Sequence, residues 1–223
     1  MHAEPVPGCR LAVVQELSIF GVLVCLTVKQ ATPERNPYPM TTYLAPIDKP
    51  EGLMLKLGYR YTRRQFGKVP GPLSVFCARM PTAFTSFYGK ISKLDKKLEL
   101  SADTAALVRE RVASTNMCLY CMDANRWAAT HKKPENAAKF DALDEYRTSP
   151  LFSDAERAAL DYATELTEDR HVSPDTFAGL SRHYSEREIC EIVWLVASEH
   201  LYNLNNIGLN IGSDGLCETG ISN

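Results

Sequence analysis

Two cysteines separated by two residues give this chain its most reactive spacing. They are Cys118 and Cys121, in the sequence CLYC. Cysteines three positions apart at the start of a helix can face each other within disulfide range. A helix N-terminus also favours the thiolate, which is the nucleophilic form of a thiol. The pair therefore predicts thiol–disulfide chemistry, and the sequence leaves open which of the two cysteines attacks.

Two other roles for the pair stay open at this level. Buried cysteines can pack as small hydrophobic residues, and a CxxC pair can supply half of a zinc site. A complete zinc site needs a second group of ligands at close spacing, and the other cysteines and the five histidines form no such motif. We therefore expect no metal and no other cofactor.

Composition narrows the class of protein. The chain has 223 residues, of which 45% are hydrophobic and 23% charged, as in an ordinary globular domain. Lys and Arg number 25 against 27 Asp and Glu, so no basic excess points to a nucleic-acid partner. Seven cysteines, scattered apart from one pair, do not form the framework of a secreted disulfide protein. The longest apolar run, residues 17–27, is too short to span a membrane. We expect a cytoplasmic protein without a membrane partner.

Proline and polar residues divide the chain into three parts. Residues 1–44 are predicted to be an N-terminal extension and linker, residues 45–212 a helical domain, and residues 213–223 a C-terminal tail. The apolar run at 17–27 resembles a signal-peptide core only weakly, because no convincing cleavage pattern follows it. An extra helix or strand, or a natural start at Met40, is therefore preferred to a secretion signal.

From residue 82 onward the hydrophobic period is that of helices, which predicts an all-α fold. One helix is expected after Thr82, with an apolar stripe from Phe84 to Leu94. Further helices are expected to begin at the following positions: Ser101, the cysteine pair (ending near His131), Pro134, Ser153, Ser173 and Ser185. Ser153 with Glu156, and Ser185 with Glu188, are capping boxes, in which each side chain satisfies a free backbone N–H at the helix start.

Three stretches resemble a known superfamily. Residues 107–131, LVRERVASTNMCLYCMDANRWAATH, are similar to the core motif of the carboxymuconolactone decarboxylase and AhpD-like alkylhydroperoxidase superfamily. Residues 152–177 and 184–212 resemble the downstream half of its longer members, so that the resemblance covers about residues 55–212. It implies an AhpD-like helical fold, a homo-oligomer (trimer, hexamer or dimer) and a CxxC pair that cycles between dithiol and disulfide while reducing organic hydroperoxides.

The resemblance carries over to the thiols and not to the proton carriers. The two redox cysteines of the superfamily fall on Cys118 and Cys121. The glutamate twelve residues before the first cysteine falls on Ala106, and the histidine four residues after the second falls on Asn125. A further histidine, between the cysteines, is here Tyr120. Ala106, Asn125 and Tyr120 therefore lack the carboxyl or imidazole group that the superfamily has at these positions.

Three other residues are candidate substitutes. Glu110 lies one helical turn nearer to the cysteines than Ala106, although a glutamate there can also be an inert surface residue. Asp123 matches a CxxCxD variant of longer members, or is a first-turn acid favoured by the helix dipole. His200, together with Glu199, interrupts an apolar helix, where a polar pair is more often hydrogen-bonded core or subunit interface.

The predicted function is that of a thiol peroxidase or disulfide reductase of the AhpD-like type. Its catalytic candidates are Cys118, Cys121, Glu110, Asp123 and His200, and its partners are an organic hydroperoxide or other small molecule and a dithiol reductant. A non-catalytic redox sensor or oligomeric scaffold is one alternative. A cofactor-free lactone decarboxylase, in which the cysteines are incidental, is the other. Cys217 is a further thiol that can exchange with the pair, although terminal segments are usually inert.

Overall fold

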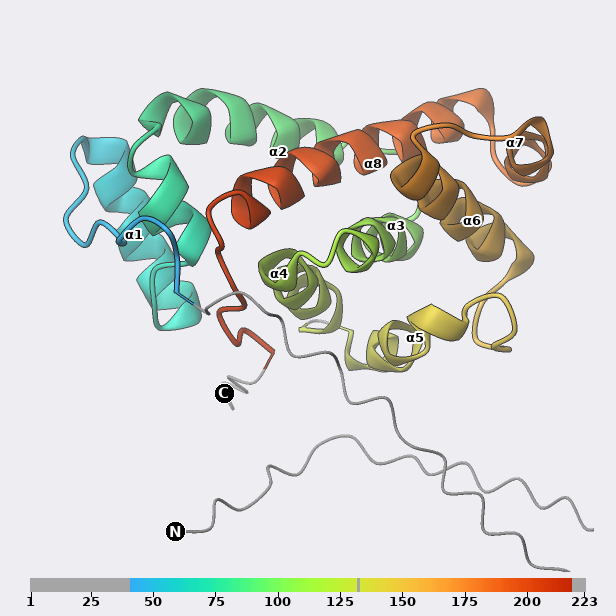
Figure 1. Cartoon of the computed structure of the whole chain (residues 1–223), viewed down its shortest axis with the longest axis horizontal. Helices are drawn as coiled ribbons and strands as arrows, with labels where there is room; N and C mark the ends of the chain where they lie inside the picture. Colours follow the sequence, from blue (N-terminus) through green and yellow to red (C-terminus); the bar gives the residue numbers. More distant parts are fainter. Residues whose placement is uncertain (1–40, 132, 218–223) are drawn as a thin grey trace, which may run out of the picture. The chain divides into compact units, whose positions relative to one another are not determined.

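The computed structural model describes residues 41–131 and 133–217, and its regular elements there are all helical (Figure 1). This confirms the predicted all-α class. The α-helices are α1 (Leu53–Phe66), α2 (Gly89–Asp95), α3 (Ala102–Thr115), α4 (Leu119–Thr130), α5 (Ala137–Asp141), α6 (Asp154–Asp169), α7 (Pro174–Ser181) and α8 (Glu186–Ile207). Short π-helical segments cover Pro72–Cys77 and Ala83–Tyr88, and 3-10 turns cover Pro134–Asn136 and Leu143–Glu145. Within these ranges no helix is both long and apolar enough to cross a membrane.

Serine caps set where four of these helices begin. The Ser101 hydroxyl accepts a hydrogen bond from the backbone N–H of Thr104 and opens α3. Ser173 caps α7 in the same way. Both predicted capping boxes, which open α6 and α8, are present with their glutamate partners. The caps were predictable because each satisfies backbone N–H groups only three residues away.

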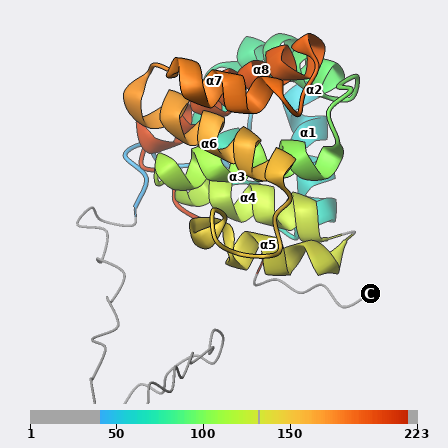
Figure 2. The same cartoon turned by 90° about the vertical axis from the view of Figure 1, so that its right-hand side faces the viewer.

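Helix α3 lies at the centre of the described fold, between α4, α6 and α8 (Figure 1, Figure 2). Its apolar side chains meet those of α6 and α8 in the largest buried cluster. The main members of that cluster are Val108, Val112, Ala159, Ala163, Ile192, Leu195 and Val196. A smaller cluster on the other side joins Leu107 and Leu160 to the α5 region. Because α3 leads directly into the cysteine turn, this packing fixes the position of both cysteines.

The helix predicted after Thr82 differs from expectation. Thr82 has helical dihedral angles and makes no capping hydrogen bond, so the helix does not start there. Among the stripe residues whose side chains are described, Ile91 is buried, whereas Phe87 and Leu94 are exposed. The reason is the π-helical segment Ala83–Tyr88, whose turns are wider than those of an α-helix. Side chains that are spaced for an α-helix therefore no longer point to the same face.

The segment after α8 is fastened to the domain, in contrast to the flexible tail expected from residue 213. Ile211 and Leu216 are buried. The Asp214 carboxylate accepts a 2.9 Å hydrogen bond from the backbone N–H of Gly71 and forms an ion pair with Lys68. A side chain at Gly71 would meet Ile211, since a Cβ there would lie 2.7 Å from Ile211 Cγ2. Residues 218–223 and 1–40, including the apolar run at 17–27, lie outside the described residues.

Candidate active site

A tight turn between α3 and α4 places the two cysteines at the start of α4. Met117 adopts a left-handed conformation with φ 56°, and the Cys118 N–H donates a 2.9 Å hydrogen bond to the Ala113 carbonyl. Cys118 is thereby the N-cap residue of α4, and Cys121 lies in its first turn. The two sulfurs form a disulfide with a Cα–Cα distance of 5.3 Å. The predicted pairing is confirmed.

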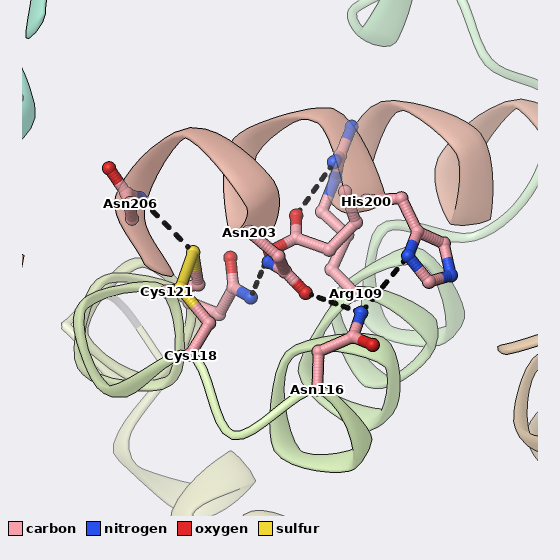
Figure 3. Close-up of a disulfide and its surroundings, with 9 residues drawn as sticks. Arg109, Asn116, Cys118, Cys121, His200, Asn203 and Asn206 are labelled. Carbon is pink, nitrogen blue, oxygen red and sulfur yellow. Dashed lines mark hydrogen bonds and ion pairs between the residues drawn. A yellow bond between two sulfur atoms is a disulfide. The ribbon is translucent and has the colours of Figure 1, made fainter. Parts of the chain in front are cut away.

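The two sulfurs differ in what reaches them. Both cysteines are buried, with 1% of Cys118 and 4% of Cys121 exposed. Cys121 Sγ accepts a 3.3 Å hydrogen bond from Asn206 Nδ2 on α8 (Figure 3). A pocket of about 200 Å³ reaches Cys121 and not Cys118. It is lined by Arg109, Tyr120, Cys121, Ala124, Asn125, Glu199, Tyr202 and Asn206. Cys121 is therefore the sulfur that a small molecule can contact.

A buried carboxyl group from α8, Glu199, lines this pocket and is only 2% exposed. Its Oε2 accepts a 3.0 Å hydrogen bond from Arg109 Nη1, in a buried ion pair. Its Oε1 accepts from Asn203 Nδ2 at 2.9 Å and from Asn125 Nδ2 at 3.3 Å. Burial raises the pKa of Glu199, although Arg109 opposes the shift. The pocket thus holds a carboxyl group of increased basicity beside Cys121.

The predicted candidate Glu110 is a buried residue of α3, not a surface one, with 7% of it exposed. Its Oε2 has no hydrogen-bond partner among the residues that the structure describes. Burial first and the neighbouring Glu199 second raise the pKa of Glu110 to about 8, while Arg126 and Asn125 act in the opposite direction. At neutral pH this carboxyl group is mostly protonated.

Asp123, the second predicted carboxyl group, holds the C-terminal segment. Its Oδ2 accepts hydrogen bonds from Ser213 Oγ and from the backbone N–H groups of Asp214 and Leu216, and its Oδ1 accepts from the Cys217 N–H. Burial acts to raise the pKa of Asp123, but these hydrogen bonds outweigh it and hold the pKa below the ordinary value. Its contacts are structural, and its predicted proton transfer stays a prediction.

His200 lies at the other end of the drawn network from the disulfide (Figure 3). Its Nδ1 is 3.1 Å from Asn116 Nδ2, and its Nε2 is 3.0 Å from Arg170 Nη1. Because a guanidinium group only donates, His200 Nε2 must accept, which keeps the ring neutral. Burial first and Arg170 second lower the pKa of His200. Its link to the pocket is indirect, through Asn116 and Asn203, and its catalytic role stays a prediction.

The two positions that lack the superfamily's proton carriers lie together. Ala106 and Asn125 both line a cavity of about 390 Å³ between α3 and α4, and Asn125 and Arg109 also belong to the pocket at Cys121.

Cys217 is exposed, and its Sγ donates to the Asp123 carbonyl at 3.4 Å. Burial raises the pKa of Cys217 to about 11, so it is a thiol at neutral pH. The described ranges contain no cluster of His, Cys, Asp or Glu able to hold a metal ion.

Three residues of the pocket are not among the catalytic candidates that the sequence predicts. In the sequence Glu199 is only half of a polar pair, whose other half, His200, is the predicted candidate. Arg109 and Asn206 gave no signal, because each reaches the pocket through packing between helices far apart in the sequence. The one usable signal was a charged residue inside the apolar stripe of residues 189–201, where burial demands a partner.

Comparisons by sequence give two relatives, both uncharacterised proteins. YnjA of Escherichia coli (strain K12) is 29% identical over 163 residues, which cover 70% of this chain and 85% of YnjA. YdfG of Bacillus subtilis (strain 168) is 22% identical over 121 residues, 53% of this chain and 82% of YdfG. No family model matches the chain.

Comparisons by structure give AhpD-like proteins and a debrominase. The debrominase Bmp8 superposes with a TM-score of 0.68 at 24% identity, covering 81% of this chain and 96% of its own. An alkylhydroperoxidase AhpD core protein from Ralstonia eutropha JMP134 gives 0.61 at 21% identity over 73% and 87%. A peroxidase-related protein from Silicibacter sp. TM1040 gives 0.59 at 21% over 82% and 94%. The chain therefore has the AhpD-like fold that its sequence resembles, with a Cys118–Cys121 disulfide at the start of α4.

Proposed function

We propose that this protein is a thiol-dependent peroxidase that reduces organic hydroperoxides through a CxxC dithiol–disulfide cycle. The observation that carries the proposal is the bridged pair at the start of α4, of which Cys121, and not Cys118, lines the pocket of about 200 Å³. The AhpD core and peroxidase-related proteins that share the fold support it. We also propose that the protein works as a homo-oligomer, as the resemblance implies, and in the cytoplasm, as its scattered cysteines indicate.

The pocket geometry supports different tasks for the two cysteines in this cycle. The Cys121 thiolate attacks the terminal oxygen of the hydroperoxide, an S–O bond forms as the O–O bond breaks, and the alkoxide takes up a proton to leave as an alcohol. The Cys118 thiol then attacks the sulfenic acid, so that a disulfide forms and water leaves. The hydroperoxide is reduced by two electrons and the thiol pair is oxidised by two.

An external dithiol closes the cycle by thiol–disulfide exchange. Its thiolate attacks Cys121 Sγ, because this sulfur lines the pocket. Cys118 is then the leaving thiolate, and its position as N-cap of α4 places it at the positive end of the helix dipole. A second thiol of the donor releases the mixed disulfide, and the protein returns to the dithiol form.

A single-turnover experiment tests the proposal. Fully reduced protein receives one equivalent of cumene hydroperoxide, and free thiols are alkylated over time and mapped by mass spectrometry. We expect stoichiometric loss of peroxide together with formation of the Cys118–Cys121 bridge. Persistence of both thiols, at the oxidation rate of an ordinary surface cysteine, would overturn the proposal and leave the sensor and lactone decarboxylase alternatives.

Three variants assign the attacking sulfur. Cys121→Ser should abolish peroxide consumption. Cys118→Ser should keep the first turnover and accumulate a sulfenic acid that dimedone traps. Cys190→Ser is the matched control, because Cys190 is an exposed free cysteine outside the pocket. The reverse pattern for the first two variants would make Cys118 the attacking residue.

A second candidate reaction, reductive dehalogenation, is favoured by the likeness to Bmp8. A structure of that debrominase with one cysteine replaced by alanine holds 2,3,4-tribromopyrrole. Here Tyr120 and Tyr202 line the pocket and offer aromatic surfaces to a flat ring. In this reaction Cys121 takes the halogen from carbon, a proton replaces it there, and Cys118 displaces halide to form the disulfide. Bromide release from a bromopyrrole, measured beside peroxide loss, distinguishes the two reactions.

A further inference from the structure

Glu199, the carboxyl group that lines the Cys121 pocket, shares its arginine with Asp95. Glu199 and Asp95 both accept hydrogen bonds from Arg109, at 3.0 and 2.9 Å. Glu110 makes no ion pair of this kind within the described residues, since its neighbour Arg126 donates to Asp141. Of the two buried carboxyl groups, Glu110 and Glu199, only Glu199 therefore has an ion pair among the described residues, and it shares that arginine with Asp95. Burying two carboxylates with so little compensation is unfavourable, so one of them must keep a proton.

Asn125 connects these two carboxyl groups. Its Nδ2 donates to Glu199 Oε1 at 3.3 Å, and its side chain also hydrogen-bonds to Glu110. Asn125 lines the pocket together with Cys121 and Glu199. Position 125 is where the superfamily resemblance leads us to expect a histidine, and position 106, where it leads us to expect a glutamate, is an alanine. A carboxyl group is nevertheless present at this place, because α8 brings Glu199 into contact with Asn125, the residue at the histidine position.

We propose that Glu199 carries the proton between Cys121 and the substrate oxygen, and that Glu110, joined to it through Asn125, is its positioning partner. This assignment deepens the proposed peroxidase function and rests on it for the substrate. Glu199 is the catalytic residue of the two, because it lines the pocket of the reacting sulfur. Glu110 acts through Glu199 and Asn125.

The proton path balances the peroxidase step. Ionised Glu199 takes up the proton that the Cys121 thiol releases before the sulfur attacks, so the thiolate already exists when an alkylating agent or a peroxide reacts. The same proton then passes to the alkoxide that leaves when the O–O bond breaks, and Glu199 is ionised again. Glu110 keeps its own proton throughout, so Cys121 faces one negative carboxylate rather than two. Ionisation of Glu110 would add a second negative charge and disfavour the thiolate.

The groups that face Glu110 come from four elements. Glu199 lies on α8, Arg126 on α4 and Asp144 in the 3-10 turn Leu143–Glu145. The thiol of Cys217, in the C-terminal segment, is also within electrostatic range. Since Glu199 and Asp144 are acidic and only Arg126 is basic, the surroundings reinforce the effect of burial and keep Glu110 neutral.

The first test separates thiol acidity from turnover in Glu199→Gln. The fully reduced full-length chain is alkylated with iodoacetamide at pH 7, and Cys121 is followed by mass spectrometry. Removing a negative charge should leave alkylation equal or faster, whereas cumene hydroperoxide consumption should fall about 10²-fold, the lower limit typical of lost acid–base catalysis. Glu191→Gln, a buried glutamate on the same helix outside the pocket, is the control and should change neither rate. A parallel fall of both rates, or an unchanged peroxide rate, would overturn the proposal.

The second test uses the pH profile of Glu110→Gln. Glutamine mimics the protonated carboxyl group, so the variant should match the unaltered protein at pH 7. Above about pH 8 Glu110 of the unaltered protein ionises. Its rates of Cys121 alkylation and of peroxide consumption should then be lower than those of the variant. Superimposable profiles would exclude Glu110 as the partner. The alkylation profile needs no peroxide, so it still tests the coupling if peroxidase activity itself is absent.

A third variant tests the replacement directly. Ala106→Glu with Asn125→His, introduced into Glu199→Gln, restores the superfamily's residue types and should recover at least 10-fold of the lost peroxide rate. No recovery in a variant with an unchanged melting temperature would overturn the claim of replacement. If Glu199→Gln does not fold, Asn125→Ala keeps both carboxyl groups and should lower the peroxide rate about 10-fold without slowing alkylation. Unchanged peroxide consumption in that variant would refute the link.

Discussion

At the scale of single residues, Asn206 donates a hydrogen bond directly to the sulfur of Cys121. Its amide contacts Cys121 Sγ in the oxidised pair. In the reduced protein the same donor faces the Cys121 thiol, and a hydrogen bond to the charged form lowers a pKa. The neighbouring Asn205 has a different task, because it donates to the Tyr88 hydroxyl at 2.8 Å. Adjacent asparagines on one helix therefore offer a clean comparison.

We expect Asn206→Ala to raise the pKa of the Cys121 thiol, because the variant loses a hydrogen bond that stabilises the thiolate. Iodoacetamide alkylation of the reduced protein at pH 7 should slow by about tenfold. Asn205→Ala should leave the alkylation rate unchanged. Equal rates in both variants would show that Asn206 does not contact the thiolate.

Glu110 also makes stability depend on pH. Its folded-state pKa of about 8 lies above the ordinary 4.5, so the folded protein binds the proton more tightly than the unfolded chain does. The contribution of this group to stability is therefore fully present below pH 4.5 and is lost as the pH rises to about 8. Glu110→Gln should remove this dependence. Between pH 5 and pH 8.5 the variant should therefore lose less free energy of unfolding than the unaltered protein does.

Urea unfolding at the two pH values measures the effect. Glu191→Gln provides a control of opposite sign. Burial acts to raise the pKa of Glu191, but hydrogen bonds from the Leu100 N–H, Arg187 and the Glu99 N–H hold it below the ordinary value. Its stabilising contribution is present above the ordinary pKa and is lost as the pH falls. A Glu110→Gln variant that follows the pH dependence of the unaltered protein would contradict the buried, protonated state.

At the scale of elements, the features that could be predicted are those that act over three or four residues. The caps at Ser101, Ser153 and Ser185 and the Cys118–Cys121 bridge all fall in this class. The wider turn before α2 could not be predicted, because a π-helical segment has no distinct residue pattern in this sequence. The individual helices between residues 53 and 80 were not predicted either. What positions them is packing, which a helical period alone does not reveal.

Only the part of the pocket that α4 forms could be predicted from the sequence. Cys121, Tyr120 and Asn125 follow from the motif itself, since all three lie on α4. Glu199 and Asn206 come from α8, and their arrival depends on how α8 crosses α3 and α4. No pairwise spacing in the sequence encodes that crossing. The same limit applies to Asp123, whose partners lie about ninety residues later in the chain.

The C-terminal segment offers the element-scale prediction. Asp123→Ala removes the acceptor of four hydrogen bonds, from Ser213, Asp214, Leu216 and Cys217. We expect a loss of about 2 kcal/mol, which corresponds to a fall of about 4–8 °C in melting temperature. Amide hydrogen exchange should accelerate at Leu216 and Cys217 first. Unchanged protection at these two amides would show that the segment is held by its apolar contacts instead.

At the scale of the whole molecule, the fold must accept both the dithiol and the disulfide form. The Cys118–Cys121 bridge closes a very short loop, so its effect on the unfolded chain is small. We expect reduction to lower the free energy of unfolding by about 2 kcal/mol or less, and the melting temperature by about 4–8 °C or less. Thermal melts with and without a dithiol reductant measure this. Global unfolding on reduction would make the bridge a structural disulfide and contradict the redox cycle.

The order of synthesis gives the C-terminal segment a further meaning. A ribosome produces α4 and its cysteines long before residues 211–217, which then pack against α4 and against Gly71. Helix α8, which supplies Glu199 and Asn206, is also made late. During translation the dithiol therefore exists without its pocket, open to any oxidant or chaperone it meets. The pocket around Cys121 is therefore complete only after α8 has been made and has packed against α4.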